Sequence, residues 1–341
     1  MTRRRLLPLV ALSTTAALTL AGCAGGSGTD ADPGSSASGT GGIAVVASTN
    51  VYGDIVETVG GDLVDVTSVI DDPSQDPHSY EADARTQLAV SRADVVVENG
   101  GGYDAFVDTL VEASGTDATV LSAVEVSGLE DTEEGDDHAH EGEEHAHEGE
   151  GEEHAEDEHG HEGHDHGAFN EHVFYSLPSM TALATAVAEA LGEIDTANAD
   201  TYTANAEAFG AQVADLQQQA DAVRAQHEGE SVAYTEPVPG YLFDAMGLVN
   251  VTPDDFSEAI EEGDDVSPAA LNETLKLFTD GRVDLLAYNE QTSSPETEQV
   301  EQAARDAGVA IVPVTELLPE GEDYVSWQQA NIDAISAALG A

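Results

Sequence analysis

Residues 195–227 of this 341-residue chain read DTANADTYTANAEAFGAQVADLQQQADAVRAQH, and this stretch sets the expected architecture. Apolar side chains recur in it at spacings of 7, 4, 3, 4 and 3 residues, at Tyr202, Phe209, Val213, Leu216, Ala220 and Val223. This spacing places them on one face of an α-helix of about 30 residues, or roughly 45 Å. We predict that residues 195–228 form a rigid spine helix that links two lobes. An ordinary surface helix within one lobe is the alternative, but such helices usually have only three or four turns.

Short β-branched runs alternate with helical patterns on both sides of this helix, which indicates an α/β fold class. The strands expected before the helix are 43–48, 63–70, 94–98 and 119–122, and those expected after it are 231–235, 283–288 and 309–314. We therefore predict two α/β lobes, each a small sheet flanked by helices, over residues 43–194 and 229–341.

The composition excludes several classes of function. The chain has 9 Lys+Arg against 68 Asp+Glu, a net charge of −59, which excludes a nucleic-acid partner because phosphates require a basic surface. The 40% of hydrophobic residues is typical of a globular protein. A single cysteine excludes a disulfide framework and cysteine-based zinc fingers. Any metal site must therefore use histidines and carboxylates.

The N-terminus has the pattern of an exported lipoprotein. A basic segment at residues 3–5 precedes an apolar run from Leu6 to Leu20, which is shorter than the about 20 residues of a membrane span. The run ends in Leu-Ala-Gly-Cys at residues 20–23, which resembles a bacterial lipobox. We expect residues 1–22 to be a signal peptide and Cys23 to carry lipid. Residues 23–42, rich in Gly, Ser, Thr and Asp, would form a flexible tether at the outer face of the cell membrane.

Residues 130–166 form a second low-complexity segment. They include 18 acidic residues and 9 of the 12 histidines of the chain, but no Lys or Arg and no large apolar residue. Without apolar side chains the segment has nothing with which to form a core, so we predict a disordered loop that binds zinc weakly. Its histidines are His138, His140, His145, His147, His154, His159, His161, His164 and His166.

Three histidines lie outside this loop. His78 lies in the sequence DPHSYE (residues 76–81), directly after a predicted strand, and His172 lies in NEHVFYSLP (residues 170–178). His227 ends the long helix, where a histidine is better explained by capping of the last turn. The two remaining histidines are candidate metal ligands.

DPHSYE and NEHVFYSLP resemble the two histidine motifs, usually written DPHxYEP and NPHxW, of the zinc/manganese-type substrate-binding lipoproteins of ABC transporters. That family also has an acidic, histidine-rich loop before the second motif and a long helix after it. A third motif resembles AYTEPVPGYL at residues 233–242, where zinc receptors often carry His and manganese receptors carry Glu. The resemblance covers residue 43 to the C-terminus.

The resemblance implies a metal-binding cleft between the two lobes, with a ligand set of His78, His172 and Glu236. The fourth ligand of the family is often a carboxylate in a loop near the C-terminus, and we look for it in YNEQTSSP at residues 288–295. Ser293 best matches the position of that carboxylate, but serine has no carboxylate. Asn289, Glu290 and Gln291 can each supply an oxygen ligand, and we select Gln291, with Glu290 or Asn289 as alternatives. Glu171 departs from the family pattern because it stands where Pro is usual.

We therefore expect an extracytoplasmic, monomeric receptor that captures Zn²⁺ and delivers it to an ABC-transporter permease in the membrane. A Mn²⁺ or Fe²⁺ receptor of the same type is one alternative, and a surface metal-buffering or adhesin lipoprotein is another. A metallohydrolase is disfavoured because the chain contains no HExxH and no GxSxG sequence, so we expect no enzymatic activity.

Deleting residues 130–166 should reduce the number of zinc ions bound and leave one tight site intact. Each zinc ion bound by the loop must also order the chain, which weakens its binding. Calorimetric titration of the intact and loop-deleted proteins with Zn²⁺ measures both quantities. An identical stoichiometry would mean that the loop is only an acidic spacer.

Overall fold

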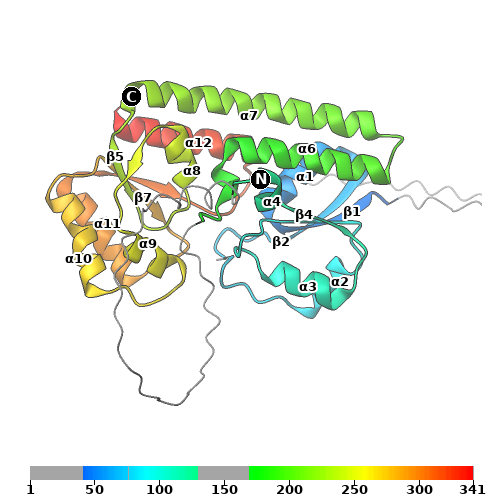
Figure 1. Cartoon of the computed structure of the whole chain (residues 1–341), viewed down its shortest axis with the longest axis horizontal. Helices are drawn as coiled ribbons and strands as arrows, with labels where there is room; N and C mark the ends of the chain where they lie inside the picture. The colour runs from blue at the N-terminus through cyan, green and yellow to red at the C-terminus, as the bar shows by residue number, and fades with distance from the viewer. Residues whose placement is uncertain (1–40, 76, 130–168, 341) are drawn as a thin grey trace, which may run out of the picture. The chain divides into compact units, whose positions relative to one another are not determined.

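The computed structural model describes residues 41–75, 77–129 and 169–340, which belong to one compact unit (Figure 1). The expected signal peptide, Cys23 and the histidine-rich loop at residues 130–166 lie outside the described residues. Within the described ranges, no helix is both long and apolar enough to cross a membrane.

The N-terminal lobe contains a four-stranded parallel sheet with the strand order β2-β1-β3-β4. The strands are β1 (Ile43–Thr49), β2 (Val64–Ile70), β3 (Val95–Glu98) and β4 (Thr119–Ser122). The helices are α1 (Asn50–Gly60), α2 (Ala84–Val90), α3 (Phe106–Ser114) and α4 (Ala123–Ser127), with a 3₁₀ turn at Gly61–Leu63. Alternate residues of the strands face opposite sides, so Val46 and Val96 pack toward α2 and α3, whereas Val45 and Val95 pack toward α1.

The C-terminal lobe repeats this plan with the order β6-β5-β7-β8, and all its strand pairs are parallel. The strands are β5 (Ser231–Tyr234), β6 (Val249–Asn250), β7 (Leu285–Asn289) and β8 (Ala310–Val314). The helices are α8 (Gly240–Ala245), α9 (Asp254–Glu261), α10 (Pro268–Thr279), α11 (Pro295–Ala307) and α12 (Tyr324–Leu339). The central strand β7 is buried along its whole length, as expected for a parallel sheet covered on both faces.

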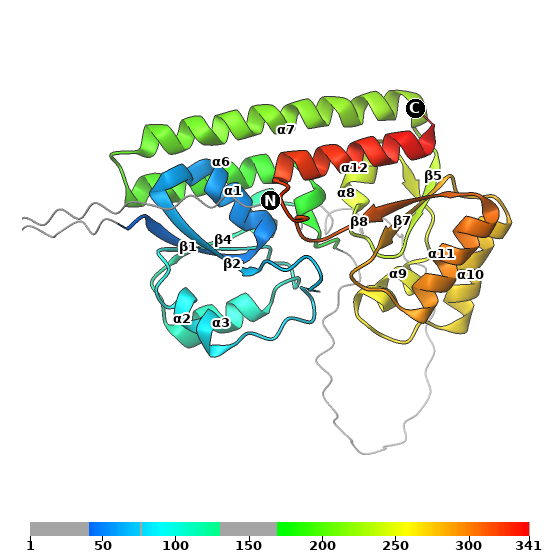
Figure 2. The ribbon, with the colours of Figure 1, turned by 180° about the vertical axis from the view of Figure 1, so that it is seen from behind.

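The long helix α7 (Ala199–His227) connects the two lobes, and it follows α6 (Leu177–Ile194). Figures 1 and 2 show α7 running alongside α6 and α12. It also contacts α1 of the N-terminal lobe and α8 of the C-terminal lobe. Its buried face consists of the predicted apolar positions together with Ala206. One apolar cluster therefore extends along α7 and includes residues of both lobes.

The predicted fold class is confirmed, and two details differ from the sequence analysis. Helix α7 begins at Ala199 rather than at residue 195, because the amide of Asn198 donates to the side chain of Asp195 and forms a turn before the helix. Strand β6 was not predicted. It has only two residues, and Val249 is exposed, so it gives no periodic signal.

Replacing Phe209 by Ala should lower the free energy of unfolding by about 3–5 kcal/mol, because a large side chain is removed from a packed core. The Phe209 ring is buried in α7, and its centroid lies 5.7 Å from that of Tyr324 in α12. Urea unfolding measures the change. Glu207→Ala, on the exposed side of the same helix, is the matched control and should stay within about 0.5 kcal/mol of the parent. Equal stability of the two variants would contradict a shared core along α7.

Candidate metal centre

The candidate metal centre is formed by side chains that follow β-strands of both lobes. His78 lies in the loop after β2, Glu236 two residues after β5, and Glu316 two residues after β8. His172 comes directly before the 3₁₀ turn at Val173–Tyr175 that precedes α6. The carboxyl ends of parallel strands lie at one edge of each sheet, which is where open α/β sheets bind ligands.

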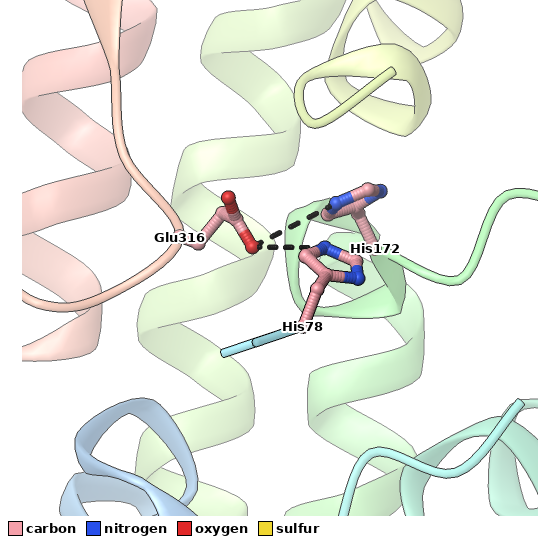
Figure 3. A group of neighbouring side chains, drawn as sticks. All are labelled: His78, His172 and Glu316. Carbon is pink, nitrogen blue, oxygen red and sulfur yellow. Dashed lines mark ion pairs between the residues drawn. The ribbon is translucent and has the colours of Figure 1, made fainter. Parts of the chain in front are cut away.

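His78, His172 and Glu316 form a compact group (Figure 3). Oε2 of Glu316 lies 3.3 Å from Nε2 of His78 and 3.9 Å from Nε2 of His172. The candidate ligand atoms of the three residues all lie within 4.8 Å of one another. The side chains of His172 and Glu316 are 1% exposed, whereas that of His78 is 18% exposed. Two imidazole nitrogens and one carboxylate oxygen therefore converge at a site that is largely shielded from solvent.

Three buried atoms at this position lack a hydrogen bond within the part of the chain that the structure describes. They are Nε2 of His172, Oε2 of Glu316 and Oε1 of Glu236. Burying such atoms without a partner costs about 1–3 kcal/mol each, and native proteins rarely leave them so. All three carry lone pairs when the histidine is neutral, so a cation is the partner that satisfies them together.

Asn289, at the end of β7, holds the two carboxylates next to each other. Its Nδ2 donates hydrogen bonds to Oε2 of Glu236 over 2.6 Å and to Oε1 of Glu316 over 2.8 Å. The hydroxyl of Thr292 also donates to Oε2 of Glu236. One oxygen of each carboxylate is thereby fixed by the protein, and the other oxygen is left for a ligand. Asn289 therefore orients the carboxylates through its amide nitrogen.

The ring of His172 is oriented by Asn170. Nδ1 of His172 lies 2.9 Å from Oδ1 of Asn170, which also accepts the backbone N–H of His172. Because this oxygen can only accept, the ring proton belongs on Nδ1, and Nε2 presents its lone pair to the site. The amide nitrogen of Asn170 donates to the carbonyl of Pro237 in the C-terminal lobe. Asn170 thus orients a ligand of one lobe and contacts the other lobe.

The pKa values of the site residues follow from burial and from their mutual contacts. Burial lowers the pKa of His172 to about 4, so this imidazole is neutral at pH 7. Burial also acts to lower the pKa of His78, but contacts with Glu171 and Glu316 outweigh it and raise that pKa well above its usual value. Burial, together with the nearby charge of Glu316, raises the pKa of Glu236 to about 8. For Glu316, burial is outweighed by His78, and its pKa is lowered.

A second group of ligand atoms shares His78 with the first, and its member Glu261 also lies near His172, with Oε1 3.6 Å from Nδ1 of that ring. It comprises His78, Glu171 and Glu261, whose ligand atoms are also within 4.8 Å of one another. Oε1 of Glu171 lies 3.2 Å from Nδ1 of His78. Burial and the charge of Glu171 raise the pKa of Glu261 to about 8. A cleft of about 440 Å³, lined by His78, Glu261, Glu262 and further acidic residues, adjoins this second group.

Of the four predicted ligands, the structure places His78 and His172 in one group with Glu316. It holds Glu236 beside Glu316 through their shared contact with Asn289, but outside that group. The amide group of Gln291 is hydrogen-bonded to the backbone. Its Oε1 accepts the N–H of Glu316 over 2.7 Å, and its Nε2 donates to the carbonyl of Gln75 over 2.9 Å.

The alternatives to Gln291 do not supply a carboxylate either. Glu290 is exposed, Asn289 turns its amide nitrogen to the carboxylates, and the hydroxyl of Ser293 lies 3.1 Å from that of Tyr288. His227 is not part of the group. It contacts Glu230 at the end of α7, with Nδ1 and Oε1 3.1 Å apart.

Glu316 was missed by the sequence analysis, which searched the loop after β7 instead of the loop after β8. A signal was present, because Glu316 follows the last predicted strand just as Glu236 follows β5. Since the two strands are neighbours of β7 on opposite sides, the loops after β5 and β8 approach the same point above Asn289. A search of every strand end for a carboxylate would have found Glu316.

The fold and the site together define the class of this protein. Two parallel-sheet α/β lobes with a long connecting helix, and candidate metal ligands from both lobes, are the architecture expected of a metal-binding solute receptor. The sequence profile of the family described as zinc-uptake complex component A, periplasmic, matches residues 45–338. The chain therefore belongs to this family of metal-binding receptors of ABC transporters, which are not enzymes. The resemblance inferred from the histidine motifs is confirmed.

Individual relatives agree with this assignment. The chain is 34% identical over 125 residues to the manganese-binding lipoprotein MntA of Halalkalibacterium halodurans, an alignment that spans 36% of this chain and only 39% of that protein. It is 25% identical over 326 residues to the iron ABC transporter substrate-binding lipoprotein MtsA of Streptococcus pyogenes, over 87% of this chain and 89% of that one. The solved structure of the periplasmic zinc-binding protein TroA from Treponema pallidum superposes on this chain with a TM-score of 0.65 and 18% sequence identity. The superposition covers 88% of this chain and all of TroA, so the two proteins share the same fold.

The metal-free protein should lose stability as the pH rises from about 5 to 8. The pKa of Glu236 is about 8 in the folded protein and near 4.5 in the unfolded chain, so the folded state binds more protons in this interval. One such proton gives a slope of up to about 1.4 kcal/mol per pH unit. In Glu236→Gln this slope should be smaller, and the variant should exceed the parent in stability at pH 8. Urea unfolding in the presence of a chelator tests this, and equal slopes would contradict a buried, protonated Glu236.

Proposed function

We propose that this receptor captures Zn²⁺ with His78, His172, Glu236 and Glu316 and delivers it to a membrane permease. The observation that carries this proposal is the set of buried atoms without hydrogen bonds on His172, Glu236 and Glu316. Together with Nε2 of His78, they provide two nitrogen and two oxygen ligands from both lobes. Zinc is bound tetrahedrally by such ligands in proteins.

Two arguments favour zinc over manganese and iron. Imidazole and carboxylate sites bind divalent first-row metals with an affinity that rises from Mn²⁺ through Fe²⁺ and stands higher for Zn²⁺. The matching family is also described by zinc uptake. A Mn²⁺ or Fe²⁺ receptor is the second candidate, because Glu236 supplies a harder ligand than His, and because MntA and MtsA are named for manganese and iron.

The receptor acts outside the cytoplasm as a monomer, anchored to the outer face of the cell membrane by lipid on Cys23. The lipobox at residues 20–23 and the lipoprotein names of MntA and MtsA support this location. Anchoring keeps the metal-loaded lobes close to the permease that receives the ion. The histidine-rich segment at residues 130–166 would scavenge or sense zinc at the same surface.

Competition between metals tests the preferred substrate. Metal-free protein is dialysed against equal concentrations of Zn²⁺ and Mn²⁺, and the bound metal is quantified by mass spectrometry. We expect one tightly bound Zn²⁺ that Mn²⁺ does not displace, in addition to weakly bound zinc that is removed by washing. Tight binding of Mn²⁺ in preference to Zn²⁺ would favour the second candidate, and the absence of any tight metal would reject the receptor function.

Each of the single variants His78→Ala, His172→Ala and Glu316→Ala should bind zinc with an affinity at least about tenfold lower, or 1.4 kcal/mol weaker. The reason is that each change removes a direct ligand. Calorimetry in the presence of a competing chelator measures the affinity. His227→Ala is the matched control, since His227 lies outside the group and contacts Glu230. The control should bind zinc like the parent. A His78→Ala, His172→Ala double variant that retains tight one-to-one binding would rule out this ligand set.

A further inference from the structure

His78 belongs to two groups of ligand atoms, and each nitrogen of its ring faces a carboxylate from one of them. Nε2 faces Glu316, 3.3 Å away, and Nδ1 faces Glu171, 3.2 Å away. We call His78, Glu171 and Glu261 the outer group, and His78, His172 and Glu316 the inner group; the ligand atoms in each lie within 4.8 Å of one another. An imidazole with two carboxylates is a suitable ligand set for a divalent first-row cation. The outer group is thus a potential cation site in its own right.

The outer group is the more accessible of the two. The side chains of His78 and Glu261 are 18% and 14% exposed, and both line the cleft of about 440 Å³. The side chains of His172 and Glu316 are each only 1% exposed. A cation that enters through this cleft therefore meets the outer group before it reaches the inner group.

The local structure fixes the position of Glu171 and places Glu261 where a negative charge is disfavoured. The carbonyl of Glu171 accepts hydrogen bonds from Asn99 and Val173, which fixes the backbone that carries this buried carboxylate. Glu261 is the last residue of α9, and Gly263, with φ of +69°, ends the helix just after it. A negative charge at a helix C-terminus is disfavoured by the helix dipole. Such a local conflict is typical of a position that serves binding.

We propose that the outer group is an entry site, where the incoming cation binds first and from which it moves to the inner group across the ring of His78. This inference rests on the proposed function of the inner group as the metal site. A neutral imidazole coordinates a metal through one nitrogen and carries its proton on the other. The two sites are therefore alternatives for one ion, which leaves one nitrogen of His78 before the other nitrogen coordinates it.

The proton count of His78 is unchanged by this transfer. With the cation on Nδ1, the proton is on Nε2 and points to Glu316. When the cation moves to Nε2, that nitrogen releases its proton to the solvent of the cleft that His78 lines, and Nδ1, freed of the cation, takes one proton from the same solvent. The Nδ1–H group then donates a hydrogen bond to Glu171. Glu171 is then the carboxylate that orients a metal-bound histidine, an arrangement common in zinc sites.

The association kinetics of Zn²⁺ with full-length Glu261→Gln test the entry site. Trp327 is the only tryptophan, and its ring stacks on Phe174, which in turn contacts His172, with centroid distances of 6.4 and 5.6 Å. Stopped-flow fluorescence of Trp327, with a zinc-responsive dye in parallel, reports ion arrival. We expect about tenfold slower association and about tenfold slower dissociation, because the same intermediate is lost in both directions. The equilibrium affinity should then stay within about twofold of the parent.

Glu262→Gln is the matched control, because it makes the same carboxyl-to-amide change in the same cleft at an exposed residue outside the outer group. Its rates should stay within about twofold of the parent. Equal association rates of the two variants would overturn the entry site, since only general electrostatic attraction would then be involved. A loss of equilibrium affinity at an unchanged association rate would also overturn it, because Glu261 would then belong to the final site. Failure of the parent itself to bind Zn²⁺ tightly would instead reject the proposed function, and the entry site with it.

Discussion

The burial of the Glu316 carboxylate between two histidines is the constraint on which the site depends. Its side chain is 1% exposed, and an unpaired charge at such a depth would cost several kcal/mol. His78 and His172 of the N-terminal lobe face one of its oxygens, and Asn289 of the C-terminal lobe binds the other. Glu316 therefore connects the two lobes through the same atoms that would hold the metal.

The surrounding polar contacts keep the lobes in register around this carboxylate. Gln291 joins the backbone of Glu316 to the carbonyl of Gln75, and Asn50 at the start of α1 exchanges two hydrogen bonds with the backbone of Leu318. Helix α7 contributes the apolar part, because its buried face packs against helices of both lobes. A cluster of buried carboxyl groups and imidazoles is thereby held in place by neutral amides and a shared core.

The sequence predicted the histidine ligands because each lies in a short motif beside a strand or turn. His78 and His172 were found in this way, and the structure places their rings 5.7 Å apart. Gln291 was selected because its amide can supply oxygen, but residue type alone does not show what a side chain contacts. In the structure, that oxygen accepts the N–H of Glu316 instead.

The sequence by itself determined the α/β class, the spine helix and most strands, because these follow from the local spacing of apolar residues. Through motifs that resemble those of a known family, it also predicted His78, His172 and Glu236 as metal ligands. Only the tertiary structure decided that Glu316 joins His78 and His172, and that Glu171 and Glu261 form a second group with His78. These groups come from segments far apart in the chain, and their approach depends on how two sheets align their strand ends, which local spacing does not encode.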